Sequence, residues 1–134
     1  MTATNKHTAE LVKLASDIPA SIEVLEAEIT QVAANMDVLK RAGLIYATEH
    51  WRKGAKGADK GKDKYFYLLY PHKNGEPRRR DYVGCDAAKI EEARAGIERA
   101  SQYDRLATQY AAMENRIHRV AQALHEAQRY LNRN

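Results

Sequence analysis

The side chains that could perform catalytic or metal chemistry are scattered through this sequence. The single cysteine, Cys85, has no CxxC neighbour and no zinc-ligand spacing around it. His118 and His125 are seven residues apart, which on a helix places them on one face but two turns from each other. The remaining histidines are His7, His50 and His72. We therefore expect a protein that is not an enzyme and that uses no metal or cofactor.

A run of lysines and glycines suggests binding rather than catalysis. The segment KGAKGADKGKDK, residues 53–64, contains Lys53, Lys56, Lys60, Lys62 and Lys64. It lacks the spacing and the Ser/Thr of a phosphate-binding P-loop, and it has no apolar periodicity. We expect a long, mobile basic loop over residues 53–63. Such a loop is either a solvated connection or an arm that contacts a phosphate backbone or an acidic partner.

Tyrosine and arginine recur in the segments KYFYLLY (residues 64–70) and RRRDYVG (residues 78–84). Side chains alternate between the two faces of a strand. If Phe66, Leu68 and Val83 face the helices, the opposite face holds Tyr65, Tyr67, Arg78, Arg80 and Tyr82. Rings beside guanidinium groups can stack on bases and bind phosphates. The alternative is that the tyrosines cover a small sheet while the arginines solvate its edge.

The distribution of charge points to the same part of the chain. The net charge is +4, and residues 43–84 carry ten Lys/Arg against five Asp/Glu. Residues 1–42 have a net charge of −2 and residues 85–134 of +1. A basic patch confined to one module favours an acidic partner there. The candidate residues for binding nucleic acid or another partner are Arg52, Lys53, Lys56, Lys60, Lys62, Lys64, Tyr65, Tyr67, Lys73, Arg78, Arg80 and Tyr82.

The elements that must position these residues are two helices, expected over residues 8–42 and 86–131. In the first, apolar residues alternate at spacings of four and three: Ile18, Ile22, Leu25, Ile29, Val32, Met36 and Leu39. The second continues the same heptad pattern through Tyr103, Leu106, Tyr110, Met113, Ile117, Val120, Leu124, Ala127 and Leu131. Such seams predict an antiparallel helical hairpin and self-association into a homodimer.

The helix boundaries also have signals in the sequence. Pro19, preceded by Ser16 and Asp17, either breaks or kinks the first helix. Gly43 is expected to end it, and Asp86 is expected to cap the second.

Between the helices, residues 43–84 predict three β-strands. The segments LIYATEHWR, KYFYLLYP and RRRDYVG are rich in aromatic and β-branched residues and are bounded by Gly, Pro and Asn. Asn74-Gly75 is a hairpin turn signal, because both residues tolerate positive φ. We expect one α+β domain over residues 1–134, with a three-stranded antiparallel sheet at the end of the helical hairpin. The chain has no run of about 20 apolar residues and no signal-peptide pattern at Met1, which predicts a soluble, cytoplasmic protein without membrane contact.

The last strand and the helix after it, RRRDYVG followed by KIEEARAGI, resemble the arm-type DNA-binding domains of phage and mobile-element tyrosine recombinases. The resemblance covers residues 64–100 and implies a small sheet that lies in the DNA major groove, backed by a helix. The long helices on both sides, and the lack of a catalytic recombinase domain, depart from that family. The layout as a whole also resembles small proteins of phages and mobile elements, a resemblance that implies no activity.

The sequence therefore predicts a non-enzymatic nucleic-acid-binding or nucleic-acid-associated accessory protein of a phage or mobile element. The alternative is a small phage or mobile-element inhibitor or adaptor, for example an anti-defence or anti-CRISPR protein, that binds a host protein complex. A prefoldin-like chaperone subunit shares the helix–hairpin–helix layout, but the basic loop weighs against it. The sequence leaves open whether the basic module binds DNA, RNA or protein.

Overall fold

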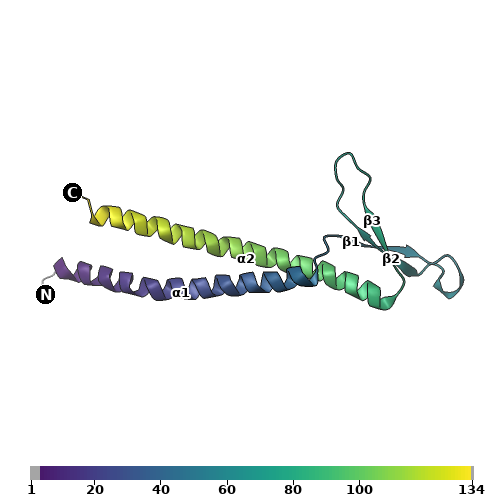
Figure 1. Cartoon of the computed structure of the whole chain (residues 1–134), viewed down its shortest axis with the longest axis horizontal. Helices are drawn as coiled ribbons and strands as arrows, with labels where there is room; N and C mark the ends of the chain where they lie inside the picture. The colour runs from purple at the N-terminus through teal and green to yellow at the C-terminus, as the bar shows by residue number, and fades with distance from the viewer. Residues whose placement is uncertain (1–3, 134) are drawn as a thin grey trace. The chain divides into compact units, whose positions relative to one another are not determined.

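The computed structural model describes residues 4–133 and shows an α+β protein (Figure 1). Its elements are α1 (Thr4–Ala42), β1 (Thr48–Lys53), the 3-10 helix η1 (Gly57–Asp59), β2 (Asp63–Leu69), β3 (Arg80–Gly84) and α2 (Ala87–Leu131). The predicted fold class, two long helices with a three-stranded antiparallel sheet between them in sequence, is confirmed. Met1, where no signal-peptide pattern was expected, lies outside the described residues.

The contacts group the chain into two compact units. We call residues 4–35 and 106–133 the helical unit, and residues 36–105 the β unit. Both helices contribute to each unit.

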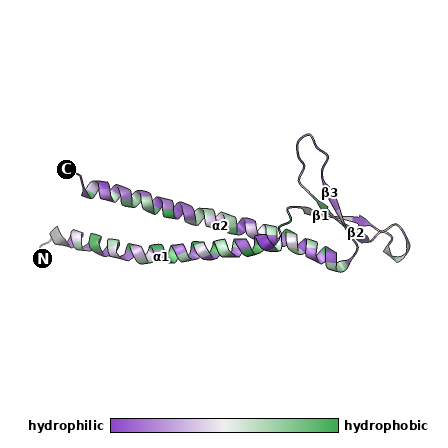
Figure 2. Cartoon of the chain, in the orientation of Figure 1, coloured by the Kyte–Doolittle hydropathy of each residue, from purple (hydrophilic) through white to green (hydrophobic). Residues whose placement is uncertain are grey.

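In the helical unit, the two helical segments run antiparallel side by side (Figure 1). Hydrophobic and hydrophilic residues alternate in short bands along both of them, as a heptad pattern requires (Figure 2). Leu25 and Met113 are buried. The predicted seam is confirmed in this unit from Ile18 to Val32 on α1 and from Leu106 to Ile117 on α2, because its other residues there are half-buried: Ile18, Ile22, Ile29, Val32, Leu106, Tyr110 and Ile117. Leu131, near the end of α2, is 78% exposed.

Pro19 lies inside one continuous helix, which excludes a break at this position. Ser16 and Asp17 do not cap a new helix, because the backbone remains helical here and the Ser16 hydroxyl donates to the Lys13 carbonyl at 2.8 Å. Proline has no N–H to donate to the carbonyl of Ala15, four residues earlier. Pro19 is exposed, so water can hydrate that carbonyl.

The core of the β unit forms where the sheet packs on α2. Phe66 is fully buried, Leu68 and Ala93 are buried with it, and Val83 packs against them. The Trp51 ring meets the Phe66 ring edge to face, with 4.9 Å between centroids. The prediction that Phe66, Leu68 and Val83 face the helical side is therefore confirmed.

The chain enters and leaves the sheet at well-defined caps. Gly43 ends α1 in the left-handed region at φ 107°, and its carbonyl accepts a 2.7 Å hydrogen bond from Arg99 Nε. Asp86 caps α2 as predicted, because its Oδ1 accepts the Ala88 amide at 3.1 Å. The Ile45 amide donates to the Gly96 carbonyl at 3.1 Å, which holds the segment after α1 against α2.

Both connections within the sheet contain backbone hydrogen bonds. The first contains η1, and the Gly54 amide donates to the Lys62 carbonyl at 2.9 Å, so this loop has a defined backbone path. The second spans residues 70–79 and contains the predicted turn at Asn74-Gly75. Within it, the Glu76 amide donates to the Lys73 carbonyl, and only Gly75 of the Asn74-Gly75 pair has positive φ.

Within residues 4–133, neither helix carries a stretch apolar and long enough to cross a membrane.

Candidate nucleic-acid interface

The strand register determines which side chains share the solvent face of the sheet. Strand order is β1-β2-β3, and Tyr67 pairs with His50 on one side and with Tyr82 on the other. Paired residues of antiparallel strands point to the same face. Because Phe66 and Leu68 are buried against α2, the opposite face holds His50, Arg52, Tyr65, Tyr67, Arg80 and Tyr82. We call these six residues the Tyr–Arg face.

The aromatic rings of the Tyr–Arg face lie close together. Tyr82 is 5.0 Å from Tyr67 and 6.4 Å from Tyr65 between ring centroids, with interplanar angles of 49° and 45°. The Tyr82 side chain remains 58% exposed. His50 meets the Tyr67 ring at 6.1 Å. The rings are tilted rather than stacked on each other, so they leave an aromatic surface open to a planar ligand.

Cationic groups lie over these rings. The Arg80 guanidinium carbon is 5.4 Å from the centroid of Tyr67, and Lys64 Nζ is 5.4 Å from that of Tyr65. Arg52 is paired with Tyr65 in the register and is exposed. Tyr65 and Tyr67 thus each have a positive group beside the ring, an arrangement that suits a ligand made of planar bases and phosphates.

Tyr82 does not reduce the positive charge of this face. Desolvation raises the pKa of its phenol, and the neighbouring Cys85 and Tyr67 raise it further, while Lys64 lowers it. The net shift is upward, away from physiological pH, where a phenol is already neutral, so the Tyr82 ring adds no negative charge to this face.

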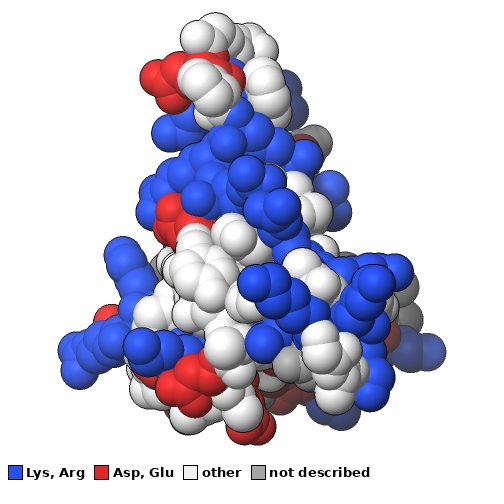
Figure 3. Space-filling model, turned by 90° about the vertical axis from the view of Figure 1, so that its right-hand side faces the viewer, with Lys and Arg blue, Asp and Glu red and all other residues white. Residues whose placement is uncertain are grey.

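Figure 3 shows Lys and Arg side chains gathered on the surface of the β unit, with fewer Asp and Glu among them. The lysines predicted to contact a ligand are exposed at the end of β1, in the loop that contains η1 and in the connection from β2 to β3: Lys53, Lys56, Lys60, Lys62 and Lys73. They surround the sheet without belonging to the Tyr–Arg face. Their chemistry fits sequence-independent contact with phosphates.

Arg78 lies outside β3. β3 begins at Arg80, so the alternation assumed from the sequence does not reach Arg78. Its Nε donates to the Tyr70 carbonyl at 2.8 Å, and its side chain lines a 440 Å³ pocket with Ile97 and Asp104 of α2. Arg78 is exposed.

Arg79 also differs from Arg80 in its contacts. Its guanidinium stacks on the Tyr70 ring at 4.4 Å and forms a two-point ion pair with Asp81. Of the three consecutive arginines, Arg80 is the one that lies over a ring of the Tyr–Arg face, that of Tyr67.

His50 is the member of the Tyr–Arg face that sequence reasoning missed. In β1, residues 48, 50 and 52 alternate onto one face, but that face can be assigned only once the pairing with β2 is known. The sequence held one indication: His50 lies two residues before Arg52, which was already a candidate, and residues two apart on a strand share a face.

Among the described residues, no group of three or more His, Cys, Asp or Glu side chains is placed to hold a metal ion. Cys85 is exposed at the corner between β3 and α2.

Comparisons of the chain with known protein families, with curated proteins and with solved structures gave no match. The resemblance of residues 64–100 to recombinase arm-type domains is not tested by these comparisons and remains a hypothesis about the sheet.

Proposed function

We propose that this protein binds nucleic acid through the Tyr–Arg face and the lysines around it, as a non-enzymatic accessory protein of a phage or mobile element. The observation that carries the proposal is the cluster of Tyr65, Tyr67 and Tyr82 with Arg80 and Lys64 over their rings. Aromatic rings give base stacking, and the cations give contact with phosphate.

The surrounding lysines would add affinity without sequence preference. Each Lys–phosphate contact releases condensed counterions, so binding should weaken steeply as salt rises. The helical unit would act as the scaffold, and its self-association would bring two binding faces to one ligand. We place this action in the cytoplasm, where such a ligand is accessible.

The test is binding of the full chain to labelled single-stranded DNA, single-stranded RNA and duplex DNA over a series of salt concentrations. Arg52→Ala with Arg80→Ala should weaken binding and lower the slope of log affinity against log salt by about one per lost phosphate contact. Tyr82→Ala should weaken single-strand binding by about 1–3 kcal/mol and leave the slope unchanged, because stacking releases no counterions.

A matched control removes the same charge elsewhere. Arg119→Ala with Arg129→Ala changes two exposed arginines of the helical unit and should leave both affinity and slope near those of the parent. If the Arg52/Arg80 variant is folded and binds DNA and RNA as the parent does, the proposal fails. A protein-binding inhibitor or adaptor, recognised by co-purification with one host complex at high salt, would then replace it.

A further inference from the structure

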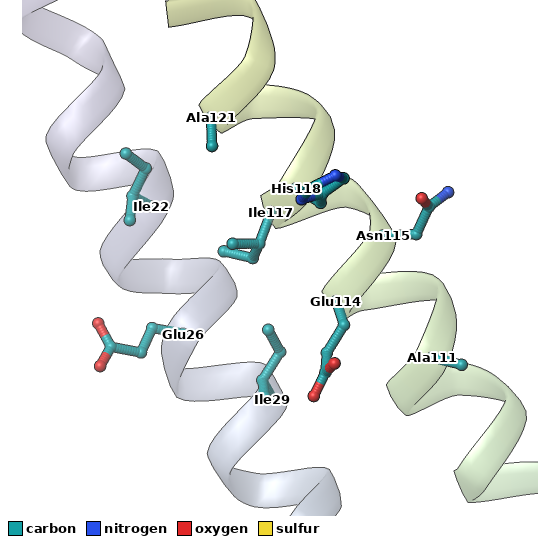
Figure 4. Close-up of a pocket in the computed structure, with 9 residues that line it drawn as sticks. All are labelled: Ile22, Glu26, Ile29, Ala111, Glu114, Asn115, Ile117, His118 and Ala121. Atoms are coloured by element: carbon teal, nitrogen blue, oxygen red, sulfur yellow. The ribbon is translucent and has the colours of Figure 1, made fainter. Parts of the chain in front are cut away.

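The helical unit exposes apolar grooves between its two helical segments. One groove of about 910 Å³ includes Glu26, Ile29, Ala111, Glu114, Asn115 and His118 in its lining (Figure 4). A second, of about 530 Å³, includes Ile18, Ser21, Leu25, Arg116, Ala123 and Leu124. Ile22, Ile117 and Ala121 line both. We call them the Glu26 groove and the Arg116 groove.

The heptad positions explain why two grooves exist. In an antiparallel pair, the residues that flank the seam form two rows, one on each side. On α1, Glu26 flanks one side and Ser21 the other; on α2, Glu114 and Arg116 do the same. The two rows therefore differ in composition, and the grooves differ with them.

The Arg116 groove is the more apolar of the two. Arg116 is the one charged residue in its lining, whereas the Glu26 groove is lined by two carboxylates, an amide and an imidazole. Helices that pack only as a pair carry a narrow seam of apolar residues, whereas helices of a four-helix bundle carry a wider apolar stripe. Ala123 lies beside the seam residue Leu124, and both are exposed, so together they give α2 that wider stripe.

The charges of the two helical segments are complementary. Residues 4–35 carry two Lys against five Asp/Glu, a net charge of −3, and residues 106–133 carry four Arg against two Glu, a net charge of +2. A second copy that places its basic segment beside the acidic segment of the first gains attraction, whereas pairing like segments costs repulsion.

We propose that the Arg116 groove binds the Arg116 groove of a second copy of this chain, so that two helical units form a four-helix bundle. Each acidic segment, 4–35, then packs between its own basic segment and the basic segment of the other copy. The contact is a two-fold interface, in which the same surface is used by both copies. Burial of Val120 and Leu124, which line this groove and are exposed in a single copy, supplies the driving force.

The arrangement predicts a specific ion pair between copies. Glu28 lies seven residues after Ser21, so it repeats on the same side of α1 as the Arg116 groove. It is also one turn from Leu25, which lines the groove with Arg116. In the bundle, Glu28 of one copy faces Arg116 of the partner subunit.

The first test is the mass of the full chain by sedimentation over a range of concentrations. The parent should dimerise. Ala123→Glu places a carboxylate inside the proposed interface and should raise the dissociation constant by more than about tenfold. Ala111→Glu makes the same chemical change in the same helix, but in the Glu26 groove, and should leave the dissociation constant unchanged.

The second test uses mixing. Glu28→Arg and Arg116→Glu should each weaken self-association, because each variant alone sets like charges against each other at this pair. An equimolar mixture should restore the dimer. In a mixed dimer, each of the two contacts between copies joins an arginine of one variant to a glutamate of the other, although within each chain positions 28 and 116 still carry like charges. Far-UV circular dichroism of every variant, compared with the parent, separates loss of association from loss of helix.

A monomeric parent at high concentration overturns the proposal. The proposal is also overturned if Ala123→Glu and Ala111→Glu weaken the dimer equally, or if only Ala111→Glu does, since the Arg116 groove would then not be the interface. A mixture that stays monomeric overturns the assigned pairing of the segments. None of these outcomes depends on nucleic-acid binding by the β unit.

Discussion

Gly96 is a residue whose identity is required by one close contact. It lies within α2, and a Cβ placed on it would be 2.5 Å from Ile45 Cδ1 and 2.8 Å from Ile45 Cγ1. Gly96→Ala should lower the free energy of unfolding, because an overpacked methyl costs about 1–3 kcal/mol and the gain in helix propensity returns about 1 kcal/mol. Thermal and urea unfolding measure the difference. Combining Gly96→Ala with Ile45→Val, which removes the nearest atom, should recover part of the loss; an equally destabilised pair would contradict the contact.

Arg78 and His50 show what residue-level inference could and could not reach. The alternation of Tyr65 and Tyr67 against Phe66 and Leu68 correctly separated the two faces of β2, because one face of a small sheet must bury its apolar residues. The alternation was then extended to Arg78, although β3 begins only at Arg80. Strand ends depend on hydrogen-bond partners in a neighbouring strand, and a single sequence does not contain that information.

At the scale of elements, the loop between β1 and β2 combines a hydrogen-bonded backbone with exposed lysines. Gly54 is buried and its amide bonds to Lys62, while Gly57 and Gly61 have φ of 64° and 79°. Replacing residues 53–62 with a short turn should therefore lower the melting temperature, since the ladder beyond Arg52 would be lost. A triple substitution of Lys56, Lys60 and Lys62 by glutamine should leave the melting temperature near that of the parent, because these side chains are exposed.

The same triple variant separates the role of the loop in binding from its role in folding. If the lysines contact phosphates, it should lower the salt dependence of nucleic-acid binding while thermal unfolding stays unchanged. Unchanged binding in a folded variant would show that the loop is only a solvated connection. Whether the loop is mobile remains a prediction that hydrogen exchange can measure.

The helices were the most predictable elements, and of the two outcomes expected at Pro19 the structure excludes the break. A repeat of apolar residues at spacings of three and four can be satisfied only by a helix with one buried stripe, and the buried and half-buried residues of α1 follow it. Pro19 was expected to break or kink that helix from local chemistry alone. The seam continues on both sides, with Ile18 and Ile22 lining one groove, so packing outweighs the single lost hydrogen bond.

For the whole molecule, the two units can be followed by separate signals. Trp51 is the single tryptophan, and it packs on Phe66 in the core of the β unit. Far-UV circular dichroism instead reports mainly the helices. Phe66→Ala should destabilise the β unit by about 3–5 kcal/mol, because the largest fully buried side chain is lost.

In Phe66→Ala, the midpoint of the Trp51 fluorescence transition should therefore fall to a much lower denaturant concentration. The midpoint of the far-UV circular dichroism transition should fall less. Met113→Ala, in the core of the helical unit, should have the opposite effect on the two signals. Two units with their own cores can open separately, even though α1 and α2 contribute to both. Coincident transitions in the parent and in both variants would instead show that the shared helices make the whole chain unfold as one cooperative body.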